Sequence, residues 1–178
     1  MQNSQTNSAS PLRILLCDDF AEIRELLATM LRRDGFEVDA AGDGASGWDA
    51  FCARPYDLLI TDNDMPLLTG LELVRRVRAI PHELPVIVIS GFARWEDSDV
   101  KSLLEPGAFI EKPFAFPVLR AKVEELMNGK LARAKRGAPA DTRPLPLQPE
   151  HGLNGNGVNA GHPRAHATPL SAASKSNG

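Results

Sequence analysis

Residues 57–66 read DLLITDNDMP, and this stretch decides the fold because an apolar run stops abruptly at acidic residues. The run from Asp57 to Thr61 shows no alternation of polar and apolar residues, which is typical of a strand buried on both faces of a parallel sheet. Asp62 and Asp64 end the run, and Pro66 follows in a turn. The stretch therefore predicts a buried strand with carboxylates at its carboxyl end.

The same organisation repeats on both sides of this stretch. Further short runs predict strands at Arg13–Cys17, Val86–Ile89 and Ala108–Ile110, and a weaker strand at Phe36–Ala41. Helical periodicity and helix start or stop residues predict helices over Ile23–Leu31, Ala45–Ala53, Gly70–Ile80, Asp97–Leu104 and Pro117–Met127. Five strands that alternate with five helices predict an α/β fold built on one parallel sheet.

Charge and composition divide the chain into a folded part and two flexible ends. Residues 1–129 have a net charge of −8, whereas residues 130–178 have a net charge of +5 and contain no aromatic residue. Such a proline- and glycine-rich tail buries too little apolar area to offset the entropy of ordering it. We therefore expect a flexible N-terminus at 1–11, a folded domain at 12–128 and a disordered basic tail at 129–178.

Polar residues stand where the predicted strands end. They are Asp18 and Asp19 after the first strand, Asp62 after the third, Ser90 after the fourth and Lys112 after the fifth. The carboxyl ends of parallel strands share one edge, where open α/β sheets bind ligands, so we expect these side chains to converge. Three clustered carboxylates repel one another, and hard oxygen ligands without histidine or thiolate favour Mg²⁺ as the compensating cation.

Four motifs together resemble the receiver domain of bacterial response regulators. They are LLCDD at 15–19, DLLITDNDMP at 57–66, VIVISG at 86–91 and FIEKPF at 109–114. The resemblance covers about residues 12–128 and implies a flavodoxin-like, doubly wound sheet with the strand order 2-1-3-4-5. It also implies a single-domain regulator, similar to the chemotaxis type, in a two-component phosphorelay.

The resemblance further implies a role for each residue at the strand ends. Asp62 would accept a phosphoryl group from the phosphohistidine of a sensor histidine kinase or phosphotransfer protein, and Ser90 and Lys112 would contact that group. The ligands of Mg²⁺ would be Asp18, Asp19, Asp62 and the backbone carbonyl of Asp64. Each residue alone has a simpler explanation, such as a helix cap or a surface lysine, but the order and placement of the set favour the phosphoacceptor interpretation.

A conformational switch is implied at Phe109, three residues before Lys112. After phosphorylation the hydroxyl of Ser90 would move toward the phosphoaspartate and Phe109 would turn inward. The surface formed by the fourth helix, the fifth strand and the fifth helix would then change its affinity for a downstream protein. Phe109 lacks the tyrosine hydroxyl that is common at this position, so the switch would be steric; the alternative is an ordinary core phenylalanine.

Three more residues leave alternatives open. The side chain of Asp64 would either position water and shorten the lifetime of the phosphoryl group, or be a solvated loop acid. Phe92 and Trp95, on the loop after the fourth strand, are either edges of the core or a patch that faces a partner.

The sequence LLITDNDM at 58–65 also resembles haloacid-dehalogenase-type phosphatases, with Asp62 as nucleophile and Asp64 as general acid. Met65 stands where that family has threonine or valine, and the acidic pair lies upstream of the nucleophile. A domain of about 120 residues leaves little room for that fold and a cap. We therefore expect a phosphoacceptor signalling domain that is not an enzyme, apart from self-phosphorylation and self-dephosphorylation.

Partners and location follow from what the sequence lacks. No run approaches the roughly 20 apolar residues of a membrane span, and the N-terminus has no export signal, which predicts a cytoplasmic protein. No effector motif follows the predicted domain, so we expect output through contact with a downstream protein. The basic tail has neither stacking aromatic residues nor a groove-reading motif, which argues against nucleic acid as a partner.

Overall fold

The fold is that of a computed structural model, which describes residues 11–81, 83–91 and 98–135. For residues 130–135 it describes the backbone alone. The interpretations of Phe92 and Trp95, and those of residues 1–10 and 136–178, concern residues outside the described ranges.

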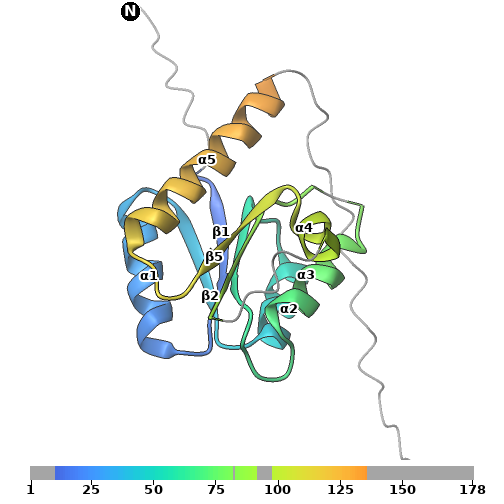
Figure 1. The fold of residues 1–178 in the computed structure, drawn as a ribbon. Helices are drawn as coiled ribbons and strands as arrows, with labels where there is room; N and C mark the ends of the chain where they lie inside the picture. The colour runs from blue at the N-terminus through green and yellow to red at the C-terminus, as the bar shows by residue number, and fades with distance from the viewer. Residues whose placement is uncertain (1–10, 82, 92–97, 136–178) are drawn as a thin grey trace, which may run out of the picture. The chain divides into compact units, whose positions relative to one another are not determined.

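Five strands and five helices alternate along the described part of the chain (Figure 1). The strands are β1 (Arg13–Cys17), β2 (Glu37–Ala41), β3 (Leu58–Asp62), β4 (Val86–Ser90) and β5 (Gly107–Glu111). The helices are α1 (Ala21–Arg33), α2 (Gly44–Ala53), α3 (Gly70–Arg78), α4 (Ser98–Leu104) and α5 (Phe116–Lys135). All strand pairs are parallel and the order is β2-β1-β3-β4-β5, which confirms the predicted α/β fold and strand order.

The sheet separates two apolar cores, because successive side chains of a strand point to opposite faces. On β1, Leu15 and Cys17 join the core that includes α2 and α3. Ile14 and Leu16 join the other core, which includes α1 and α5. Figure 1 shows these helices on the two faces of the sheet, with α4 on the side of α2 and α3. Burial on both faces explains why the sequences of the central strands β1, β3 and β4 read as nearly continuous apolar runs.

Most element boundaries differ from the predictions by one or two residues, and the end of the last helix differs by more. β3 ends one residue later than expected, because Asp62 still pairs with Ile89 of β4. The last helix continues to Lys135 instead of ending at Met127, since the sequence KLARAK after Gly129 consists of strong helix formers. The helix therefore passes the domain boundary predicted at residue 128. Within the described ranges, no helix is long and apolar enough to cross a membrane.

Arg78, the last residue of α3, ties together segments that are far apart in the sequence. Its guanidinium donates to the carbonyl oxygens of Leu84 at 2.7 Å, Leu103 at 3.1 Å and Leu104 at 3.2 Å, and Nη2 lies 3.5 Å from that of Pro106. Two of these carbonyls belong to the end of α4, where a helix lacks internal donors. Burial lowers the pKa of the guanidinium, so this charge is held largely by hydrogen bonds to the backbone.

We expect Arg78→Met to lower the free energy of unfolding by about 2 kcal/mol, because several partly buried carbonyls lose a charged donor. Urea denaturation monitored by circular dichroism measures the change. Arg75→Met is the matched control, since Arg75 is exposed on the same helix and its loss should cost less than about 0.5 kcal/mol. Equal stability of Arg78→Met and Arg75→Met would show that water replaces the guanidinium.

Candidate functional site

The carboxyl edge of the sheet brings the predicted site residues together. Asp18 directly follows β1, Asp62 ends β3 and Ser90 ends β4. Backbone hydrogen bonds fix these ends: the amide of Asn63 donates to the carbonyl of Ile89 at 2.8 Å, and that of Lys112 donates to the carbonyl of Ser90 at 2.9 Å. The strand register therefore sets the spacing of the side chains.

Three carboxylates form a compact acidic cluster at this edge. One oxygen each of Asp18, Asp19 and Asp62 lies within 4.8 Å of the others, and Asp18 and Asp62 are only 1% and 2% exposed. Burial raises the pKa of Asp18, and the neighbouring charges of Asp62 and Asp19 raise it further, against the backbone amide of Phe20 and the ammonium of Lys112. The ionised cluster is thus unfavourable by itself.

The cluster fits a divalent cation. Oδ1 of Asp19 is buried and finds no hydrogen-bond partner among the described residues. All the ligand atoms are hard carboxylate oxygens, which suits Mg²⁺, an ion that uses a few carboxylates and keeps several waters. A cation among these oxygens would satisfy the orphaned atom and remove the repulsion.

We expect Asp18→Asn to have opposite effects with and without the metal. Without metal, the variant is more stable than the wild type, because a desolvated and repelled charge is gone while an amide oxygen still accepts from Phe20. Mg²⁺ at about a hundred times its Kd adds about 2.7 kcal/mol to the wild type by mass action. The same concentration should add less than about 1 kcal/mol to Asp18→Asn. Thermal unfolding in EDTA and in Mg²⁺ measures both effects, and an unchanged gain in Mg²⁺ would contradict the assignment of Asp18 as a ligand.

Lys112 supplies the positive charge of the site. Its Nζ lies 2.6 Å from Oδ2 of Asp62, and the lysine side chain is 33% exposed whereas that of Asp62 is 2% exposed. The ammonium therefore reaches from the surface into a buried carboxylate. A short charge-assisted hydrogen bond of this kind orients the oxygens of Asp62.

The backbone around Asp62 is held by a close approach of α3. A Cβ atom at Gly70, the first residue of that helix, would lie 2.2 Å from the carbonyl oxygen of Asp62, so only glycine fits. The amide of Gly70 donates to the carbonyl of Asn63, and the side chain of Asn63 accepts from the amide of Leu71. The loop after β3 is therefore tied to the start of α3.

The hydroxyl of Ser90 contacts the carboxylate of Asp64. Its Oγ donates to Oδ2 of Asp64 at 3.2 Å. The backbone amide of Asp64 donates in turn to Oδ1 of Asp62, at 3.3 Å. Asp64 thus contacts both Asp62, the predicted acceptor, and Ser90, which is predicted to contact the phosphoryl group.

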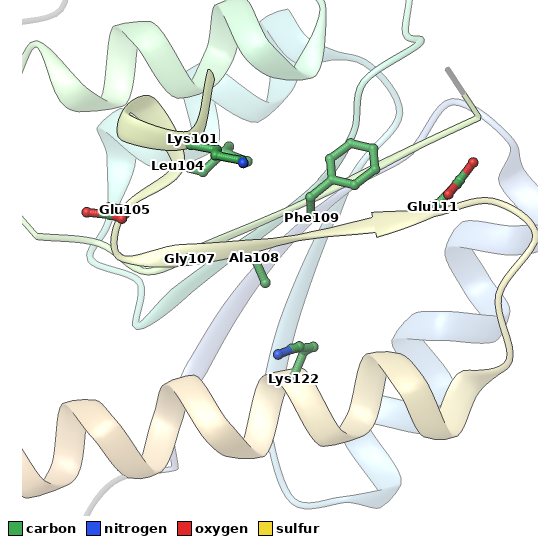
Figure 2. A pocket seen from close by; sticks show the side chains of 8 residues that line it. All are labelled: Lys101, Leu104, Glu105, Gly107, Ala108, Phe109, Glu111 and Lys122. Atoms are coloured by element: carbon green, nitrogen blue, oxygen red, sulfur yellow. The ribbon is translucent and has the colours of Figure 1, made fainter. Parts of the chain in front are cut away.

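Phe109 lies on β5 opposite Val88 of β4 and packs against the core that includes α2 and α3. Figure 2 shows its ring on the side of α4, while Ala108 points the other way, toward α5. The ring lines a pocket of about 500 Å³. The lining residues are Lys101, Leu104, Glu105, Gly107, Ala108, Phe109, Glu111 and Lys122. The pocket lies among α4, β5 and α5, the elements predicted to signal.

Sequence reasoning missed Arg24, which braces the loop that contains the acidic pair. Its guanidinium, on α1, donates to the backbone carbonyl of Asp18 at 2.7 Å. It also lies 3.5 Å from the position of a Cβ at Gly42, which follows β2. The separation of six residues between Arg24 and Asp18 carries no motif, so only the folded arrangement reveals the contact.

Comparison with known proteins agrees with this geometry. The sequence profile of the response regulator receiver domain matches residues 14–124. The chain is 33% identical over 121 residues to the chemotaxis protein CheY of Pseudomonas aeruginosa, which covers 66% of this chain and 97% of that protein. It is 35% identical over 120 residues to the response regulator MprA of Mycobacterium sp. (strain KMS), which covers 66% of this chain but 51% of MprA. The chain therefore spans about half the length of its MprA relatives.

Solved structures show the same architecture. The response regulator TrrA of Thermotoga maritima, in complex with Mg²⁺ and BeF, is 31% identical with a TM-score of 0.59, covering 65% of this chain and 98% of that one. A CheY-like receiver domain protein of Methanospirillum hungatei is 25% identical with a TM-score of 0.65, covering 70% of this chain and 99% of that one. These matches set aside the phosphatase alternative, in which Asp64 would be a general acid.

Proposed function

Since the chain belongs to the response regulator receiver domain family, we propose that Asp62 is its phosphoacceptor, with a sensor histidine kinase or phosphotransfer protein as donor. The observation that supports this most is the buried carboxylate of Asp62, which clusters with two further carboxylates and forms an ion pair with Lys112. A receiver domain is a signalling phosphoacceptor rather than a classical enzyme.

Phosphoryl transfer to Asp62 requires little covalent chemistry from the rest of the protein. A carboxylate oxygen of Asp62 attacks phosphorus, the P–N bond of the phosphohistidine breaks, and its electron pair returns to the imidazole nitrogen. Catalysis then rests on alignment and on neutralising the charge of the phosphoryl oxygens. Mg²⁺, when bound, supplies part of that positive charge; its proposed ligands are Asp18, Asp19, Asp62 and the backbone carbonyl of Asp64.

The other residues of the site act on the phosphoryl group after it arrives. The ammonium of Lys112 already reaches Asp62 and is placed to meet a phosphoryl oxygen. Ser90 ends the neighbouring strand and offers a hydroxyl donor. We assign the switch to Phe109, which lies two positions before Glu111 on the strand that pairs with β4.

The signal leaves through the surface of α4, β5 and α5. The pocket there has Phe109 in its lining, so a change in the position of this ring alters the pocket directly. A downstream protein that inserts a side chain into the pocket would distinguish the two states. The charged rim contains both lysine and glutamate, which suits a protein partner better than a nucleic acid.

We further propose that the receiver domain occupies residues 12–128 and that the protein works in the cytoplasm, where a histidine kinase has ATP. The basic segment at 129–178 would then be a tail rather than a second domain.

Acetyl phosphate and Mg²⁺ test the proposed function without a kinase. Intact mass spectrometry should find a single added phosphoryl group on the wild type, and none when EDTA replaces Mg²⁺. The same protein should not turn over p-nitrophenyl phosphate. Catalytic release of many equivalents of phosphate, or an unmodified protein in Mg²⁺, would refute the proposal.

A further inference from the structure

Asp64 contacts three groups around the proposed site. Its backbone amide donates to Oδ1 of Asp62 at 3.3 Å, and its Oδ1 accepts from the side chain of Asn63 at 3.3 Å. Its Oδ2 accepts from the hydroxyl of Ser90 at 3.2 Å. The last bond joins the ends of β3 and β4, which are neighbours in the sheet.

A hydroxyl has one proton to donate. While Ser90 donates that proton to Asp64, it cannot donate it to a phosphoryl oxygen on Asp62. We propose that the Asp64 side chain is a positioning residue: it holds the Ser90 hydroxyl until Asp62 is phosphorylated and so lowers the tendency of the domain to switch. This inference rests on the proposed function of Asp62 and adds a regulatory role for the side chain of Asp64.

The geometry also accounts for release. At 3.2 Å the bond is longer than the usual 2.7–2.8 Å of a hydroxyl donor, so it holds the proton weakly. Asp64 is exposed, and its carboxylate is free to turn toward water. A phosphoryl group on Asp62 adds negative charge next to Asp64 and repels that carboxylate, while it offers Ser90 new oxygen acceptors. Both effects transfer the hydroxyl from Asp64 to the phosphoryl group.

Competition of this kind has a measurable cost. A ligand that needs the proton of Ser90 binds only those domains in which Ser90 has left Asp64. Its apparent Kd is therefore the intrinsic Kd divided by the fraction of such domains. Removal of the Asp64 carboxylate should therefore strengthen binding of a phosphoryl mimic, but only if the Ser90 hydroxyl is present.

Beryllofluoride serves as the probe, in saturating Mg²⁺, with Kd measured by isothermal titration calorimetry on the full chain. We expect Asp64→Ala to bind beryllofluoride about fivefold more tightly than the wild type. This factor corresponds to the free energy of one weak hydrogen bond, the one between Ser90 and Asp64 that the ligand no longer has to break. Asp64→Asn keeps an acceptor for Ser90 and should fall between the two. The control Asp49→Asn removes an exposed negative charge on α2 and should leave Kd unchanged.

A double-mutant cycle identifies the cause, because it isolates the term that depends on both residues. In a Ser90→Ala background, Asp64→Ala should no longer tighten binding. If the gain persists there, Asp64 acts only through its charge and the proposal is wrong. Unchanged or weaker binding by Asp64→Ala also overturns it, as does a slower decay of the phosphoryl group with unchanged Kd, which would indicate that Asp64 positions water.

Failure of the proposed function would look different. In that case the wild type itself would neither bind beryllofluoride nor accept a phosphoryl group from acetyl phosphate, and the role of Asp64 would fall with it. Urea unfolding of every variant shows whether a lost signal reflects a lost fold.

Discussion

Asp62→Asn should accept no phosphoryl group from acetyl phosphate in Mg²⁺, under conditions in which the wild type is fully modified. An amide is a far weaker nucleophile than a carboxylate, and the nearest alternative acids do not lie in the same position: Asp18 and Asp19 come from the end of β1. Intact mass measures the total uptake and peptide mapping gives the modified residue. The loss should be complete rather than partial, because the residue forms the covalent bond.

The control for this variant is Asp49→Asn, which removes an exposed acid on α2 and should be modified like the wild type. Modification of Asp62→Asn at the same rate as this control would exclude Asp62 as the acceptor. Slow modification of Asp18 or Asp19 alone would leave the assignment intact, provided that the wild type is modified only at Asp62.

Lys112→Ala should slow phosphoryl uptake by about a hundredfold while Mg²⁺ still binds. In enzymes, removing one preorganised donor from developing negative charge lowers the rate by a factor on the order of 10²–10³. Here the ammonium already lies 2.6 Å from Asp62, so it has little reorganisation to complete. Mass spectrometry of quenched samples measures the rate of phosphoryl uptake. The rise in melting temperature with Mg²⁺ concentration measures the metal affinity.

Two further variants test whether the position and shape of the Lys112 charge matter. Lys112→Arg keeps the charge but changes its shape, and should recover part of the rate. Arg75→Ala removes an exposed cation from α3 and should have no effect. If Lys112→Ala loses Mg²⁺ binding and rate to the same extent, the lysine acts through the metal site, and a direct role toward the phosphoryl group is wrong.

The fold could be predicted well because burial on both faces of the sheet leaves a plain pattern. The central strands β1, β3 and β4 show nearly continuous apolar runs, and each run ends at a polar residue near the carboxyl edge, whereas the edge strand β2 contains Glu37 and Asp39 and gives a weaker signal. The predicted end of β3 is one residue too early, because Asp62, although polar, still pairs in the sheet. The end of α5 was misjudged because Asn128 and Gly129 indicate a stop, whereas the helix formers beyond them continue it.

The site could be predicted only as far as strand ends determine position. Convergence of Asp18, Asp19 and Asp62 follows from topology, since parallel strands end at one edge. The partner of a side chain does not follow from topology: the hydroxyl of Ser90 donates to Asp64, a contact that depends on the side-chain rotamers of both residues. Arg78 illustrates the same limit, because its carbonyl partners come from segments 6 to 28 residues away.

The glycine at the start of α3 has a consequence for engineering. Because no larger residue fits between that helix and the carbonyl of Asp62, the helix and the acceptor strand form one transplantable unit. A chimera that grafts the acceptor loop into another receiver should keep Gly70 together with Asp62, and one that takes the loop without its helix should misplace the carboxylate even where every acidic residue is preserved.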